Sequence, residues 1–178
     1  RQAVFASEDQ RIWFECMRDR GWTAPTWPKE YGGGGLNNAE AKVLKEEMDR
    51  LGCRAPLWSF GLMMLGPAIL HFGTEEQKQK FLMPVAQGQA IGAFCLSEPE
   101  AGSDATSQRT TAEDKGDHYL LNGTKNWITN GGTASFYIVM CQTDKEKGHR
   151  GINAIVVEKG MEGFIVGEKE DKMGIRAS

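Results

Sequence analysis

The spacing of apolar and polar residues changes near residue 90 of the 178-residue chain. Before that point apolar residues recur with the 3.6-residue period of a helix, and after it they form the short runs typical of strands. The sequence therefore predicts an α+β fold. An all-α domain is expected over residues 1–92 and an antiparallel β domain, incomplete at its end, over residues 93–178.

Three amphipathic helices are predicted, over residues 7–20, 40–51 and 75–85. Their apolar faces consist of Ile12, Trp13, Cys16 and Met17, then Val43, Leu44, Met48 and Leu51, and finally Phe81, Leu82 and Val85. The most apolar stretch, residues 57–72, contains glycine and proline and is shorter than the ~18 apolar residues that a membrane span needs. It predicts a buried helix pair or a kinked helix.

Turn and capping residues separate these helices. Gly52 and Gly73 can each end a helix, and Thr74 with Gln77 makes a capping box for the next one. Between the first two helices, two prolines and four consecutive glycines, residues 32–35, indicate an irregular loop and are most often a flexible turn. The glycine run lacks the order of a P-loop, and no dinucleotide-binding GxGxxG occurs anywhere.

After residue 90 the pattern predicts short strands. They are expected over residues 106–112, 118–121, 124–129, 136–141 and 152–158, with a further one beginning at 163–166. Asn122 and Gly123 form a two-residue hairpin signal, because both central positions of that turn need a positive φ. Residues 143–150 are charged and read as an exposed connection.

Composition and charge narrow the functional classes. The net charge of −3 provides no basic field for nucleic acid or anionic lipid. Four cysteines lie far apart, without a CxxC pair or a histidine at metal spacing, so no metal site is predicted. Cys95 and Cys141 read as buried, reduced thiols, and no signal peptide is visible. We expect a reducing compartment, bacterial cytoplasm or mitochondrial matrix, and no membrane association.

The segment FCLSEPEAGSD, residues 94–104, is the most informative part of the chain. It is a short apolar strand that ends abruptly in hydroxyl, carboxylate, proline and glycine residues. Ser97 can begin a helix as its N-cap, but nothing after Asp104 continues a helix, so a binding loop at a strand end is the competing interpretation. Glu98 and Glu100, like Asp104, can act as acids or bases, although solvated loop acids are the commoner case.

The segment GTKNWITNGG, residues 123–132, follows soon after. A tryptophan in a strand is usually a core residue. Thr129 and the polar residues beyond it favour a position at the rim for Trp127, where its indole can serve as a ligand platform. Together the two segments offer hydroxyls, turn amides and one flat indole, which suit a flavin ring system and its pyrophosphate. The three histidines form no recognisable site.

The two segments, in this order and at this separation, resemble the acyl-CoA dehydrogenase family. Residues 94–103 are similar to its first flavin-binding signature and residues 127–129 to its second; WPKEYGGGGL, HFGTEEQKQKFL and the terminal MGIRAS also match phrases usual in that family. The resemblance covers nearly the whole chain. It implies a helical domain followed by a barrel-like β domain, in a flavoenzyme that converts an acyl-CoA thioester to its trans-2-enoyl-CoA.

The resemblance also implies residue roles. It assigns FAD binding to Phe94, Cys95, Leu96, Ser97, Gly102, Ser103, Trp127, Ile128 and Thr129. Ser97 would place its hydroxyl on a ring heteroatom, Trp127 would cover the flavin face away from substrate, and Thr129 would bond near N5. Gly102 and Ser103 would line the pyrophosphate, and Ser103 would also border the acyl-CoA. Ser97 keeps the hydroxyl of the family's usual threonine.

The family's general base is a carboxylate in a C-terminal helical domain, and no residue in 1–178 is a credible substitute. We therefore expect an inactive fragment of a homo-oligomeric enzyme that passes electrons to an electron-transfer flavoprotein. An oxidase relative that reduces O₂ is one alternative. A non-catalytic module that binds acyl-CoA or flavin, or serves as an interaction surface, is another.

Overall fold

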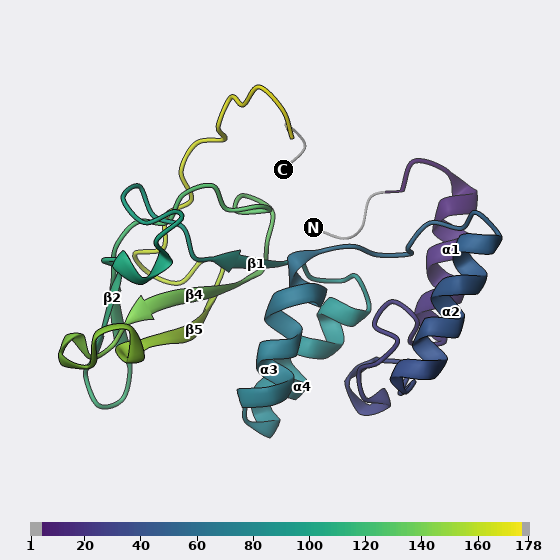
Figure 1. The fold of residues 1–178 in the computed structure, drawn as a ribbon, viewed down its shortest axis with the longest axis horizontal. Coiled ribbons are helices and arrows are strands. Elements are labelled where there is room, and N and C mark those ends of the chain that lie inside the picture. Colours follow the sequence, from purple (N-terminus) through teal and green to yellow (C-terminus); the bar gives the residue numbers. More distant parts are fainter. Residues whose placement is uncertain (1–4, 176–178) are drawn as a thin grey trace. The chain divides into compact units, whose positions relative to one another are not determined.

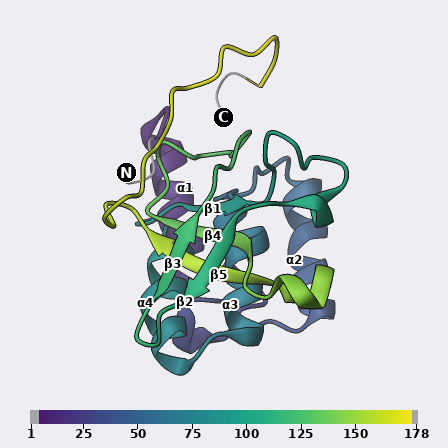
Figure 2. The same ribbon diagram turned by 90° about the vertical axis from the view of Figure 1, so that its left-hand side faces the viewer.

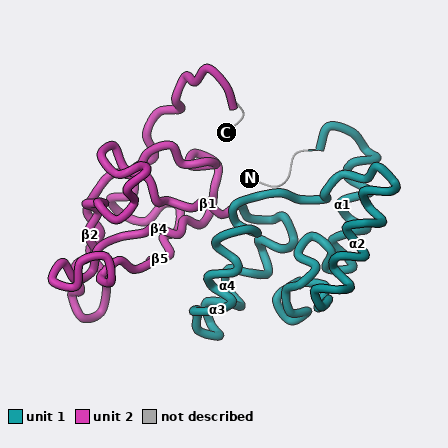
Figure 3. Tube along the Cα trace, viewed as in Figure 1, with its two compact units in different colours: residues 1–91 teal, residues 92–178 magenta. Residues whose placement is uncertain are grey.

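Helices and strands occupy different parts of the chain in the computed structural model, which describes residues 5–175 (Figure 1). Two units, residues 1–91 and 92–178, hold the helices and the sheet respectively (Figure 3). The predicted α+β fold class is confirmed. Within the described residues, no helix is long and apolar enough to cross a membrane.

The three predicted amphipathic helices are present, each within two residues of its expected ends. They are α1 (Glu8–Asp19), α2 (Asn38–Arg50) and α4 (Glu75–Ala86). The predicted capping box is formed as well: the Thr74 hydroxyl accepts from the N–H of Gln77, and the Gln77 side chain accepts from the N–H of Thr74. The loop residues before the helices therefore specify where the helices begin.

The buried faces agree with the prediction only for α4, whose Phe81, Leu82 and Val85 are buried. On α1 the buried residues are Phe14 and Met17. Other positions on the two predicted faces of α1 and α2 are exposed, namely Ile12, Cys16, Val43 and Leu51, and α2 has no fully buried residue. Periodicity identified these two helices correctly, but it did not predict how much of each face is covered.

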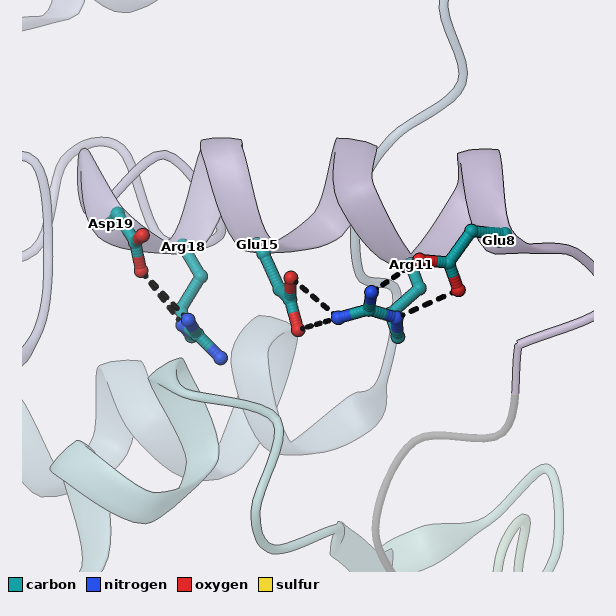
Figure 4. A network of polar contacts seen from close by, with 5 residues as sticks. All are labelled: Glu8, Arg11, Glu15, Arg18 and Asp19. Atoms are coloured by element: carbon teal, nitrogen blue, oxygen red, sulfur yellow. Dashed lines mark hydrogen bonds and ion pairs between the residues drawn. The ribbon is translucent and has the colours of Figure 1, made fainter.

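Charged side chains lie in a row along one side of α1 (Figure 4). The guanidinium of Arg11 bridges the carboxylates of Glu8 and Glu15, one turn to either side, and the Arg11–Glu15 pair is 2.7 Å long. A second pair joins Arg18 to Asp19 at 2.8 Å. Exposed pairs of this kind contribute at most about 1 kcal/mol each. Burial of Phe14 and Met17 is therefore the larger contribution to holding α1 in place.

Residues 60–72 of the apolar stretch form one continuous helix of changing pitch, which is closer to the predicted kinked helix than to the predicted helix pair. A π-helical turn, Gly61–Leu65, runs directly into α3 (Gly66–Phe72). Leu65 and Ile69 are buried, whereas Phe72 is largely exposed. The segment is thus buried on one side only.

The glycine run 32–35 is a packed turn and not a flexible connection. The N–H of Gly33 donates to the carbonyl of Pro28, and that of Gly35 donates to the carbonyl of Trp27 at 2.9 Å. A Cβ on Gly33 would lie 2.2 Å from the Trp27 carbonyl oxygen. This backbone-to-backbone approach requires glycine.

The second unit contains a mixed sheet (Figure 2) of β1 (Gly92–Cys95), β2 (Thr111–Asp114), β3 (Tyr119–Asn122), β4 (Phe136–Gln142) and β5 (Ile152–Glu158). The order is β1-β4-β2-β3, and β5 also pairs with β4. The β2–β3 and β4–β5 pairs are antiparallel, as predicted, but β1 and β2 each run parallel to β4. Strands β4 and β5 match the predicted ranges within one residue.

Several predicted local features of this unit are wrong. Residues 106–112 contribute a 3₁₀ turn, Ala105–Ser107, and join the sheet only from Thr111. The β2–β3 hairpin turns where the N–H of Lys115 donates to the carbonyl of His118, and so Asn122-Gly123 is not its turn. Residues 124–129 and 163–166 are not strands. The last three residues of the MGIRAS phrase lie outside the described residues.

Candidate functional site

The two informative segments lie side by side at the end of β1. The backbone N–H of Asn126 donates a 3.0 Å hydrogen bond to the carbonyl of Ser97. Strand β1 itself is fixed by its parallel pairing with β4, in which Phe94 lies opposite Ile138. Segments 29 residues apart in sequence are therefore held in contact, so that Ser97 and Trp127 belong to one surface region.

Glu98 is buried beneath this region, and its carboxylate is fully engaged. One carboxylate oxygen accepts from the backbone N–H of Arg109 at 2.6 Å, and the other accepts from the N–H of Thr110 at 3.0 Å. The ammonium of Lys125 lies 2.7 Å from the second oxygen. The expectation of a solvated loop acid is thus wrong for Glu98, whereas Glu100 and Asp104 are exposed as expected.

Lys125 is the functional candidate that sequence reasoning missed. Its side chain is only 9% exposed, and its ammonium donates to three acceptors: Glu98, the carbonyl oxygen of Leu96 at 2.9 Å and the side-chain oxygen of Gln108 at 3.0 Å. A lysine is rarely buried unless it is paired. One feature of the sequence could have identified Lys125. It is the one charged residue in the stretch Asn-Gly-Thr-Lys-Asn-Trp-Ile-Thr, and its partner Glu98 lies 27 residues earlier, in the other informative segment.

Hydrogen bonding dominates the charge state of Glu98. Burial alone would raise the pKa of this carboxyl, but the N–H of Arg109, the ammonium of Lys125 and the N–H of Thr110 outweigh it and lower the pKa to about 2. The group is therefore a carboxylate at any physiological pH. Since a base of such low pKa is weak, Glu98 is suited to holding structure and not to removing a proton from carbon.

Trp127 has a left-handed backbone, with φ of 57°, and a side chain that is 63% exposed. The alternatives of a core residue and a strand residue are both wrong. In the amide orientation that satisfies both of its ends, the Asn126 side chain donates to the Glu98 carbonyl and accepts from the Trp127 indole N–H, each at 3.2 Å. The indole is thus anchored by its nitrogen while much of its surface remains open.

The loop that follows carries Ile128 and Thr129, both half-buried. The hydroxyl of Tyr137 on β4 lies 2.8 Å from the carbonyl of Gly131 and 3.0 Å from that of Ala134. The loop is therefore attached to the sheet that contains β1. Hydrogen bonds thus hold the chain on both sides of the Trp127–Thr129 segment.

The remaining predicted residues divide into two groups. Phe94, Leu96 and Ser97 are half-buried along the exit of β1, whereas the Cys95 thiol is buried and its pKa is raised by that burial to about 11. Cys95 can therefore contact a ligand only through its backbone. Gly102 and Ser103 are exposed on the turn that follows the Glu98–Ala101 bridge. Among residues 5–175, no hydrogen bond or ion pair joins that turn to Trp127.

The chemistry of this region fits a planar, hydrogen-bonding ring. The exposed Trp127 follows Asn126, whose N–H is hydrogen-bonded to Ser97, and a planar ring can stack on an exposed indole while hydroxyl groups bond to its edge. By contrast, no group of three or more metal-binding side chains gathers within the described part of the chain.

Comparison with known proteins gives matches over both units. A family model described as the acyl-CoA dehydrogenase N-terminal domain matches residues 2–89, and one described as the middle domain matches residues 93–178. The short-chain specific acyl-CoA dehydrogenase of Clostridium acetobutylicum is 43% identical over 163 residues, which cover 91% of this chain and 43% of that relative.

Solved structures are also similar to this chain over nearly its whole length. A chain in the structure described as the electron transferring flavoprotein of Acidaminococcus fermentans is 43% identical with a TM-score of 0.72, covering 94% of this chain and 44% of that one. The prolyl acyl carrier protein oxidase AnaB is 32% identical with a TM-score of 0.77, covering 95% and 45%. The chain spans less than half the length of each of these proteins.

Proposed function

The chain belongs to the acyl-CoA dehydrogenase family, and on that premise we propose that it supplies the flavin-contacting surface of an enzyme that oxidises acyl-CoA thioesters to trans-2-enoyl-CoA. The observation that carries the proposal is the contact between the Ser97 and Trp127 segments through the Asn126–Ser97 hydrogen bond. This contact assembles one surface from the two segments that resemble the family's flavin signatures.

In this proposal bound FAD would supply the acceptor for the hydride lost from the β carbon of the thioester. The Trp127 indole would stack on its ring system, and the hydroxyls of Ser97 and Thr129 would donate to ring heteroatoms, which would stabilise negative charge there. The exposed turn with Gly102 and Ser103 approaches the pyrophosphate, and Ser103 also borders the substrate. Phe94, Leu96 and the backbone of Cys95 line the ring edge.

The proton on the α carbon requires a base other than Glu98. That carboxylate is the buried acid next to the proposed flavin surface, and its low pKa and its pairing with Lys125 make it a poor proton acceptor. We infer that another carboxylate of the complete enzyme abstracts this proton. Accordingly, the 178-residue chain is expected to bind FAD without turning over substrate.

An electron-transfer flavoprotein is the proposed electron acceptor, and the complete enzyme is proposed to be a homo-oligomer. The likeness to a chain of the Acidaminococcus fermentans structure described as an electron transferring flavoprotein supports the acceptor. The relative from Clostridium acetobutylicum favours short acyl chains as substrates. Measuring the reduction of a purified electron-transfer flavoprotein by the complete enzyme and butyryl-CoA tests the proposed acceptor and the proposed acyl length.

An oxidase that delivers its electrons to O₂ is the second candidate. The likeness to a prolyl acyl carrier protein oxidase, with a TM-score of 0.77, favours it. The two candidates differ in acceptor only. Oxygen consumption that matches substrate oxidation supports the oxidase, and dye or flavoprotein reduction without oxygen uptake supports the dehydrogenase.

We also propose a reducing compartment, the bacterial cytoplasm or the mitochondrial matrix. Cys95 and Cys141 are buried free thiols, and burial raises the pKa of both, so they behave as inert core residues. Mass spectrometry of the native protein that found either thiol in a disulfide would contradict this assignment.

Titration of the chain with FAD is the direct test of the proposed function. Flavin fluorescence should be quenched on binding, because the indole of Trp127 stacks on the ring. Replacing Trp127 with leucine should remove most of the quenching, whereas replacing the exposed Trp58, in the other unit, should not. Absence of FAD binding to the wild-type chain, or turnover of butyryl-CoA by it, would contradict the proposal.

A further inference from the structure

The buried pair of Lys125 and Glu98 connects the segments that carry the proposed flavin contacts. We propose that both are positioning residues, which fix the peptide between Leu96 and Ser97 and hold the Trp127 segment beside it. The inference rests on the proposed flavin-binding function and adds to it two residues that themselves do not touch the ring. From the sequence alone, Glu98 reads as a solvated loop acid, and Lys125 is not singled out.

The pair draws together three stretches of chain. Glu98 belongs to the exit of β1, and its carboxylate binds the backbone N–H groups of Arg109 and Thr110, which lead into β2. Lys125 belongs to the segment before Trp127 and reaches the carbonyl of Leu96 and the side chain of Gln108. The ammonium group of Lys125 therefore links the segment at the exit of β1 to the segment that carries Trp127.

Lys125 also sets the direction of a single peptide group. Its ammonium holds the Leu96 carbonyl oxygen at 2.9 Å. Because a trans peptide is planar, the N–H of Ser97 points to the opposite side, away from the buried pair. That N–H has no hydrogen-bond partner among residues 5–175, and it lies next to the Ser97 hydroxyl. This N–H is therefore the donor that we expect a bound ligand to use.

A contribution to the stability of the fold does not by itself explain why Glu98 and Lys125 are buried as an ion pair. Desolvation of two ions offsets much of their attraction, and buried ion pairs can often be replaced by apolar residues without loss. A requirement for one fixed backbone geometry gives a better reason, because ligand contacts depend on sub-ångström placement. The satisfied donors and acceptors around Glu98 and Lys125 are what such a requirement predicts.

The test compares Lys125→Met with Val157→Ala in the 178-residue chain. Methionine keeps an unbranched side chain, one atom shorter than lysine, but removes all three donated hydrogen bonds. Val157 is a buried residue of β5 that lies opposite Tyr137 on β4, so its truncation lowers stability but leaves every hydrogen bond of Lys125 and Glu98 in place. Gln108→Leu, which removes one acceptor of Lys125, is a milder variant in case Lys125→Met does not fold.

The first measurement needs no flavin. Amide hydrogen exchange and the indole N–H resonance of Trp127 are followed by NMR at a temperature at which every variant is folded. Lys125→Met and Gln108→Leu should speed exchange at Asn126 relative to the other β-unit amides, and shift the Trp127 indole signal. Val157→Ala should do neither. Unchanged exchange at Asn126 and an unchanged indole signal in both site variants would overturn the inference.

The second measurement uses FAD. Lys125→Met should weaken FAD binding by about tenfold, because the binding surface is no longer preorganised, and should change the visible spectrum of the bound flavin. Val157→Ala should leave both unchanged. Equal effects of Lys125→Met and Val157→Ala would reduce the pair to a purely structural role and overturn the inference. Failure of the wild-type chain to bind FAD contradicts the proposed function instead, and the hydrogen-exchange result still decides whether the pair positions these segments.

Discussion

The ammonium of Lys125 lies 2.7 Å from the carboxylate of Glu98, in a position where both side chains are more than nine-tenths buried. The two residues come from the two segments that resemble flavin signatures, and neither segment alone reveals the pairing. The same carboxylate accepts two backbone N–H groups, so its negative charge has three donors. The consequences for stability and for ligand binding can be measured separately.

Acid should weaken the fold through Glu98. The folded protein lowers the pKa of this group to about 2, below its ordinary value of 4.5. A group with a lowered folded pKa contributes its full stability above its unfolded pKa and loses it as the pH falls toward the folded value. We therefore expect the free energy of unfolding of the β unit to fall between about pH 5 and pH 2, by on the order of 3 kcal/mol from this group.

Urea unfolding at a series of pH values tests this expectation. In Glu98→Gln the acid-dependent loss should be smaller, because the titrating group has been removed, although the variant is less stable at pH 7. Glu113→Gln is the control, since Glu113 also pairs with a lysine but is exposed. The same acid sensitivity in Glu98→Gln as in wild type would contradict the role of Glu98.

Trp127 should carry backbone strain that glycine relieves. A non-glycine residue in the left-handed region costs roughly 1 kcal/mol or more, and Trp127 has a φ of 57°. Trp127→Gly should therefore be about 1 kcal/mol more stable than Trp127→Ala in urea unfolding. Both variants lose the indole, so both should bind FAD poorly.

The comparison of the two variants separates backbone strain from loss of the side chain. An alanine variant as stable as the glycine variant would show that residue 127 is not left-handed in solution. Strong FAD binding by either variant would instead show that the indole does not contribute to FAD binding. It would not affect the conclusion that residue 127 has a left-handed backbone.

Local patterns predicted much of this fold because local physics determines those parts. The capping box of Thr74 and Gln77 fixed the start of α4, and the apolar runs of β4 and β5 gave their ranges within one residue. Each of these features depends on residues close in sequence. The same is true of Ser7, which begins α1 as its N-cap.

The site was less predictable because it depends on contacts between distant residues. A glutamate in a polar turn looks solvated, and Glu98 is buried only because Lys125 and two backbone N–H groups arrive from elsewhere in the chain. Trp127 lies within residues 124–129, which are predicted as a strand, yet the Asn126 contacts to Ser97 and Glu98 hold it in an irregular loop. Tertiary contacts thus overrode the local preference at both positions.

Gly123 should be intolerant of any side chain. A Cβ at this position would lie 2.3 Å from the hydroxyl oxygen of Thr110 and 2.7 Å from its Cα. Since the Cα belongs to the backbone, the clash cannot be relieved by a rotamer change. We expect Gly123→Ala to reduce the free energy of unfolding by about 1–3 kcal/mol, and Gly167→Ala, with open space around it, to be nearly neutral. Equal stability of the two variants in urea would contradict the close packing of Gly123 on Thr110.

Gly102 should show the opposite behaviour, with function affected and stability preserved. A Cβ there meets nothing within 4 Å, and its φ is not positive, so Gly102→Ala should change the free energy of unfolding by less than about 0.5 kcal/mol. If its backbone approaches the FAD pyrophosphate, as proposed, the added methyl group should weaken FAD binding several-fold. Gly167→Ala, equally open and outside both signature segments, should leave FAD binding unchanged. Isothermal titration with FAD compares the two variants, and wild-type affinity in Gly102→Ala would exclude close backbone approach at this turn.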